Sequence, residues 1–218
     1  MTLRLYLTLL IFTFFVAKGQ PPAKVWSLGL DISQFNYLIG TGSKGFNAGV
    51  CGQYQPYRFL SINTSLMHNS VNYQRGKWYD RLEKYHSEGV CFKLGFDLSV
   101  KISKGEKNTR AFFGYQGMIT RYKESGQFEI DNYWGKYTNT YETKIRQKLA
   151  REVIFGLQYN KKQWIIRPQI FSIFAMDDIR ISPNDDIVKG YKSPFIPGFG
   201  FRRGGINLIV MYRLGKYR

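Results

Sequence analysis

The stretch 90-VCFKLGFDLSVK-101 alternates apolar and polar residues with a period of two. Its apolar positions are Val90, Phe92, Leu94, Phe96, Leu98 and Val100. The positions between them are Cys91, Lys93, Gly95, Asp97, Ser99 and Lys101. Successive side chains of a β-strand point to opposite faces, so the pattern predicts a strand with one apolar and one polar face. Strands of soluble sandwiches usually have about five or six residues, whereas a tilted strand needs about 9–11 to cross a membrane.

Similar alternation recurs along the chain, and no segment has the pattern of an amphipathic helix. We expect strands at residues 25–38, 46–55, 58–73, 89–102, 110–123, 150–160, 163–175 and 204–214. Within them, Asn63, Met67, Arg167 and Gln169 are expected to face inward. The sequence therefore predicts an all-β protein, an eight-stranded antiparallel transmembrane β-barrel of the outer-membrane type.

The connections between these segments alternate in length. Residues 55–57, 103–109 and 160–162 form short joins, whereas 74–88, 124–149 and 176–203 form long ones; residues 39–45 are short although they lie on the long side. Outer-membrane barrels have short periplasmic turns and longer extracellular loops. An even number of strands then places both mature termini in the periplasm. Aromatic girdles are expected from Trp26, Tyr54, Tyr57, Trp164 and Tyr212 at the turns and from Tyr37, Tyr73 and Tyr122 at the loops.

The N-terminus has the three parts of a secretory signal peptide. A basic start ends at Arg4, an apolar run covers residues 5–16, and the small residues Ala17 and Gly19 precede a cleavage point. The apolar run is too short for a membrane-spanning helix, which needs about 20 residues. We expect a signal peptide at 1–19, a barrel domain at 20–218 and integral insertion in the bacterial outer membrane.

The chain is strongly basic, with a formal net charge of +17. An exported basic chain meets lipopolysaccharide phosphates, anionic lipids or acidic proteins rather than nucleic acid. Two basic groups near the predicted loops are candidates for such contacts, although they also fit plain solvation of the loops. The candidates are Lys144, Arg146, Lys148, Arg151, Lys189, Lys192, Arg202 and Arg203.

Residues 45-GFNAGV-50 through Tyr54, then 60-LSIN-63 and 72-NYQRG-76, resemble the outer-membrane β-barrel domain family of Bacteroidota, which includes PorT-like proteins. Members of that family carry a Gly-Phe-x-x-Gly second strand and a Tyr-Ser-x-x-Gly-like end to the third. The resemblance covers about a third of the mature chain. It implies an eight-stranded barrel in the outer membrane without shared catalytic residues. Members of the family differ in role, and some assist secretion or larger membrane assemblies.

The interior of the predicted barrel carries charges of both signs. Asp31, Lys93, Asp97, Lys101, Arg167 and Arg213 all fall on the inward face. Side chains just fill an eight-stranded barrel, so these charges predict a paired network rather than a channel. Cys51 and Cys91 lie on inward faces of strands that are not neighbours, so free thiols are at least as consistent with the sequence as a disulfide. No cofactor site or metal-ligand spacing is evident.

One arrangement permits an enzymatic hypothesis. His68 and Ser70 close the third predicted strand, and Glu83 or Glu88 follows across the loop. A His-x-Ser pair with a nearby carboxylate is similar to the site of lipid A deacylase barrels. That motif stands late in the deacylases, however, and its Ser-Asn-Gly continuation is absent here. We therefore expect a non-enzymatic accessory subunit of an outer-membrane assembly for secretion or barrel insertion, docking through its loops. The two alternatives are a stand-alone barrel passing small apolar solutes and the hydrolase.

Overall fold

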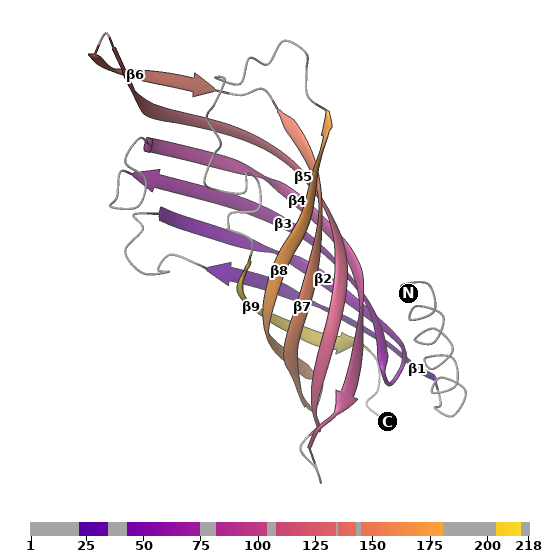
Figure 1. Cartoon of the computed structure of the whole chain (residues 1–218). Helices are drawn as coiled ribbons and strands as arrows, with labels where there is room; N and C mark the ends of the chain where they lie inside the picture. The colour runs from indigo at the N-terminus through magenta and orange to yellow at the C-terminus, as the bar shows by residue number, and fades with distance from the viewer. Residues whose placement is uncertain are drawn as a thin grey trace, which may run out of the picture.

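The chain folds as a closed antiparallel β-barrel of eight strands, in a computed structural model that describes residues 22–34, 43–74, 82–103, 108–133, 135–142, 145–180 and 204–214 (Figure 1). Its strands are β1 (Pro22–Gln34), β2 (Ser43–Tyr57), β3 (Leu60–Gln74), β4 (Leu82–Lys101), β5 (Asn108–Asn132), β6 (Gly135–Glu142), β7 (Arg146–Lys161), β8 (Trp164–Arg180) and β9 (Gly204–Leu214). Pairing of β1 with β9 closes the ring, and β6 pairs with β5 outside it. No helix of the described residues is long and apolar enough to cross a membrane.

The strands are staggered around the barrel. Paired residues followed from Trp26 on β1 through β2, β3, β4, β5, β7 and β8 lead to Gly204 on β9. Trp26 itself pairs with Leu214, so the path returns to β9 ten residues away from its direct partner. A stagger of this size requires strands that are tilted by about 35–45° from the barrel axis.

The eight predicted strands are confirmed, but several extend further than expected. β4 begins at Leu82 rather than at residue 89, β7 begins at Arg146, and β8 continues to Arg180. The predicted loop 124–149 is wrong, because β5 runs on to Asn132 and forms a hairpin with β6. These extensions are rich in polar residues on both sides, so the apolar alternation that marks the barrel wall fades there while backbone pairing continues. The last four residues of the first predicted strand lie outside the described residues.

The two ends of the barrel differ, as the connection lengths predict. At the turn end, β2 joins β3 through residues 58–59, and β7 joins β8 through 162–163, where Lys162 has a φ of 54°. At the loop end, the β5–β6 hairpin extends beyond the ring; Figure 1 shows it at the upper left, away from the first residues of β1. The short connections therefore gather at one end and the long strand extensions at the other.

Burial is reversed relative to a water-soluble core. On β4, Lys93 is 7% exposed and faces the lumen, whereas its neighbour Leu94 is 53% exposed and faces outward. The other strands of the ring follow the same division. Outward apolar side chains with large exposed areas include Trp26, Leu28, Leu30, Val50, Ile62, Leu66, Val90, Phe92, Phe96, Val100, Phe113, Ile119, Phe155, Ile166, Ile170, Ile206 and Leu208. The buried charges thus lie in the interior, among polar residues and two apolar clusters, and apolar residues cover most of the outside.

Candidate functional site

The lumen is crossed by buried ion pairs. Arg167 on β8 donates from Nη2 to Asp97 Oδ2 on β4, and Lys93 Nζ on β4 lies 3.2 Å from Glu152 Oε1 on β7. Neither β7 nor β8 is a neighbour of β4 in the ring, so both pairs connect separate parts of the wall. Gly114 makes room for the first pair, because a Cβ at that position would overlap Asp97 Oδ1. The predicted internal charge network is therefore present.

Neutral groups extend this network. Asn63 Oδ1 accepts a second bond from Arg167 at 3.2 Å and a bond from Gln53 at 3.1 Å. The guanidinium carbon of Arg167 also lies 4.0 Å from the centroid of the Phe112 ring. On the neighbouring strands β9 and β1, Asn207 Nδ2 donates to Asp31 Oδ1 at 2.7 Å. Arg167 is the hub of these contacts, since it holds an acid, an amide and an aromatic ring.

Most inward assignments are confirmed, with one exception. Asn63, Met67, Arg167 and Gln169 are all buried in the lumen, as their positions predicted. Lys101 is exposed, so its assignment to the internal network is wrong. It is the last residue of β4, at the turn end, where an inward position in the alternation no longer faces an enclosed space.

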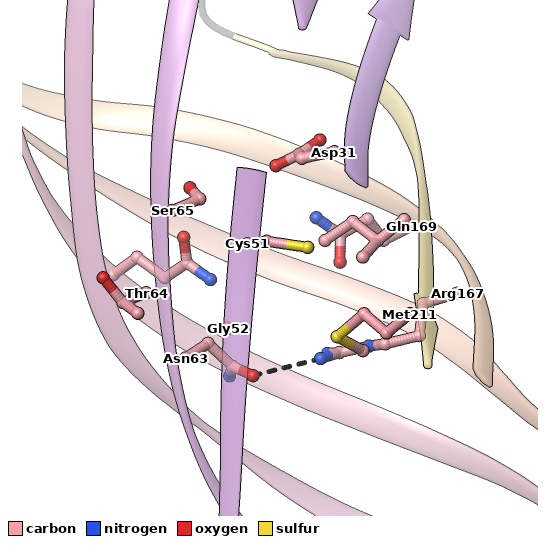
Figure 2. Close-up of a pocket in the computed structure, with 11 residues that line it drawn as sticks. Asp31, Cys51, Gly52, Asn63, Thr64, Ser65, Arg167, Gln169 and Met211 are labelled. Carbon is pink, nitrogen blue, oxygen red and sulfur yellow. Dashed lines mark hydrogen bonds between the residues drawn. The ribbon is translucent and has the colours of Figure 1, made fainter. Parts of the chain in front are cut away.

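Beside the Arg167 hub lies a small cavity of about 20 Å³, lined by both polar and apolar side chains (Figure 2). Its walls include Asp31, Asn63, Arg167 and Gln169, together with the Cys51 side chain. A cavity needs roughly 10–15 Å³ of such volume to hold one water molecule, so this one has space for water but not for an organic solute. Gln169 Oε1 and Asn63 Nδ2 lack hydrogen-bond partners among the described residues, and buried polar atoms of this kind are the usual partners of internal water. This cavity by itself is too small for the passage of an organic solute.

Both cysteines are buried free thiols. Cys51 on β2 adjoins Ile165, Ile209 and Met211, whereas Cys91 on β4 belongs to a separate apolar cluster. β3 stands between their strands in the sheet order, as the sequence suggested. The disulfide alternative is therefore excluded in this structure.

The hydrolase candidates His68, Ser70 and Glu88 share the outward face, and no hydrogen bond among the described residues joins them. Ser70 pairs in register with Glu88, while His68 pairs with Val90. The histidine beside Glu88 is instead His86, whose Nε2 lies 3.5 Å from Glu88 Oε2 and whose Nδ1 is 2.7 Å from Asn72 Oδ1. The Glu88 carboxylate is therefore paired with His86 and not with His68, so the contact between His68 and a carboxylate that the hydrolase hypothesis needs is not seen in the described part of the chain. Across the described residues, no group of three or more His, Cys, Asp or Glu side chains could hold a metal ion.

The predicted basic candidates are only partly within the described structure. Arg151 is exposed on β7, where it pairs with Gly117. The backbones of Arg146 and Lys148 pair with Tyr122 and Thr120 on β5. The remaining candidates lie outside the described residues: Lys144, Lys189, Lys192, Arg202 and Arg203.

Sequence reasoning missed two exposed cations on β5, Arg121 and Lys123. They occupy the same outward positions of the alternation as Phe113 and Ile119, with which they share the strand. That shared parity was visible in the sequence. It was overlooked because the basic clusters near the loops are denser.

Aromatic side chains gather outside the turn end. Trp26 stacks on Tyr54 with ring centroids 4.5 Å apart, and Trp164 meets Tyr212 edge-on at 5.3 Å. The expected second girdle is not supported at Tyr122, which is 2% exposed and faces the lumen. Tyr37 lies outside the described residues, as does the side chain of Tyr73.

These features define a class of protein: a closed eight-stranded β-barrel with an apolar exterior and a packed, ion-paired lumen. No protein-family model matches the sequence, and no curated protein matches it either.

Proposed function

We propose that this chain is an integral outer-membrane β-barrel that acts without catalysis, as an accessory subunit docking partner proteins through its loop end. The observation that carries the proposal is the largely apolar exterior around a lumen that holds the buried charges. Water would solvate such a surface poorly, whereas hydrocarbon chains would cover it. Ring closure leaves the barrel wall without an unpaired edge, as a bilayer requires.

The height of the apolar exterior suits a bilayer. On β4 the outward apolar residues run from Val90 to Val100. At about 3.4 Å per residue and a tilt near 40°, this run corresponds to about 25 Å along the axis, the height of the apolar band in outer-membrane barrels. The predicted signal peptide and the resemblance to Bacteroidota outer-membrane barrels support the same location. The short turns would then face the periplasm, with both mature termini.

The loop end is the proposed docking site because the lumen is filled, whereas the β5–β6 hairpin is exposed. The lumen is filled by cross-barrel pairs, so an interior function has little space. The β5–β6 hairpin instead presents Tyr133 at 95% exposure and Tyr137 at 49%. Exposed tyrosines are common anchors of protein interfaces. We take this hairpin as the principal contact for a partner in the outer membrane or at the cell surface.

The test is purification of the tagged barrel from native membranes in mild detergent. We expect a stoichiometric partner that is lost when residues 127–140 are replaced by a short turn. Tyr133→Ala and Tyr137→Ala together should weaken retention at least tenfold, whereas Tyr159→Ala, outward on the barrel wall, serves as the matched control. A chain that purifies only as a monomer, although it is correctly folded, contradicts the docking role.

A further inference from the structure

The outward apolar surface ends differently at its two borders. At the turn end it finishes in the aromatic pairs Trp26–Tyr54 and Trp164–Tyr212. At the loop end the outward positions of β5 change directly from the apolar Ile119 to cations. Aromatic rings suit the interface of ordinary phospholipids, whereas a row of cations suits a leaflet dense in phosphate. The turn end thus has an aromatic border, although Lys161 also lies exposed there, and β5 has a cationic border at the loop end.

Two of the cations form a pair on one strand. Arg121 and Lys123 are both exposed and, two residues apart on β5, have backbones about 7 Å apart on the same face. Neither side chain makes an ion pair or hydrogen bond with a residue in the described part of the chain. Glu88 is the register partner of Lys123, but its carboxylate lies beside His86 Nε2 at 3.5 Å. Both cations thus remain available to an external anion.

A third cation stands on the adjoining strand. Arg151 on β7 is exposed and pairs with Gly117 on β5, four residues before Arg121. The surface is recessed at Gly117, since a Cβ added there would meet only the Leu94 carbonyl oxygen, at 3.9 Å. A long arginine stem can lie over such a recess and along apolar surface while its head group reaches toward the polar border.

From this arrangement we propose that Arg121, Lys123 and Arg151 form a binding site for the phosphate group of a phosphorylated glycolipid in the outer leaflet. The ligand combines acyl chains, which cover the apolar wall below Arg121, with a phosphate at the height of the cations. Arginine binds phosphate oxygens through two parallel N–H donors, and lysine adds a point charge. The inference rests on the proposed membrane location, and it names a lipid partner beyond the docking role.

The experiment is native mass spectrometry of the purified full-length barrel in detergent, with bisphosphorylated lipid A as the probe. Dephosphorylated lipid A and inorganic phosphate are the comparison arms. We expect retention of the bisphosphorylated lipid and at least tenfold weaker retention of the dephosphorylated form. Inorganic phosphate at millimolar concentration should displace little lipid, because it lacks the acyl chains. In the R121Q/K123Q variant, retention of bisphosphorylated lipid A should fall roughly fivefold per removed cation.

The matched control is K101Q/K161Q, which removes two exposed cations from the turn end and should leave lipid retention unchanged. Equal retention of both lipid A forms would overturn the proposal, and so would an equal loss in the control variant, which would indicate a bulk charge effect. Insertion of the same variants into liposomes is measured in parallel. Normal insertion without phosphate selectivity rejects this site alone, whereas failed insertion of the wild-type chain rejects the membrane location.

Discussion

Replacing Arg167 with leucine is expected to lower the free energy of unfolding by about 3–5 kcal/mol. The substitution leaves the Asp97 carboxylate, which is 1% exposed, buried without its guanidinium partner. It also removes the bond to Asn63 and the contact with the Phe112 ring. Urea titration of the barrel refolded in lipid vesicles, followed by tryptophan fluorescence, measures the change.

Two further variants show whether this loss comes from the buried pair. Arg167→Leu combined with Asp97→Leu should recover much of the stability, because no unpaired charge then remains in the lumen. Arg121→Leu removes an exposed cation and should change the unfolding free energy by less than about 1 kcal/mol. If Arg167→Leu costs no more than Arg121→Leu, the lumen network does not stabilise the barrel as described.

A charge placed at the middle of the outward surface should have the second-largest effect. Leu94→Arg is expected to destabilise the vesicle-inserted barrel by about 2–4 kcal/mol, since an arginine there would face the bilayer midplane. Val100→Arg, on the same face of β4 near the turn end, should cost only about 0–1 kcal/mol. Both residues are largely exposed in the structure, at 53% and 62%, so neither effect would arise from core packing.

Comparing the two variants shows whether lipid or water covers the outside of the barrel. Equal and small losses at both positions would mean that the outward surface is solvated rather than covered by hydrocarbon. The same urea titration serves for both, and correct folding is checked from the shifted migration of unheated samples in gel electrophoresis.

Sequence reasoning predicted the barrel wall well because the wall obeys one simple rule. Wherever one face of a strand is apolar and the other polar, as between Val90 and Val100, side-chain parity reports inside and outside directly. The rule held even at Asn63 and Gln169, where the alternation is imperfect, because their neighbours determine the parity.

The rule failed where a strand leaves the wall. β5 and β6 pair through residues 125–142, yet backbone hydrogen bonding between strands outside the ring imposes no apolar face. The predicted placements of Lys101 and Tyr122 were wrong for related reasons. Lys101 keeps inward parity where nothing encloses it, and Tyr122 was assigned to the border by its position near a strand end although its parity places it in the lumen.

The sequence could not predict which charged side chains pair with one another in the lumen. Inward charges were evident, but the pairing of Arg167 with Asp97 rather than with Asp31 depends on strand stagger and curvature. The same limit applies to His86, which adjoins Glu88 on its own strand while Asn72 comes from the neighbouring one.

Spin labelling of the vesicle-inserted protein tests whether the outward face of the barrel contacts lipid. A nitroxide at position 94 is compared with one at position 137 on the hairpin, in a background where Cys51 and Cys91 are serine. At Leu94 we expect frequent collisions with oxygen and few with a water-soluble nickel chelate, and the reverse at Tyr137. Nickel collisions at position 94 as frequent as those at position 137 would contradict the account.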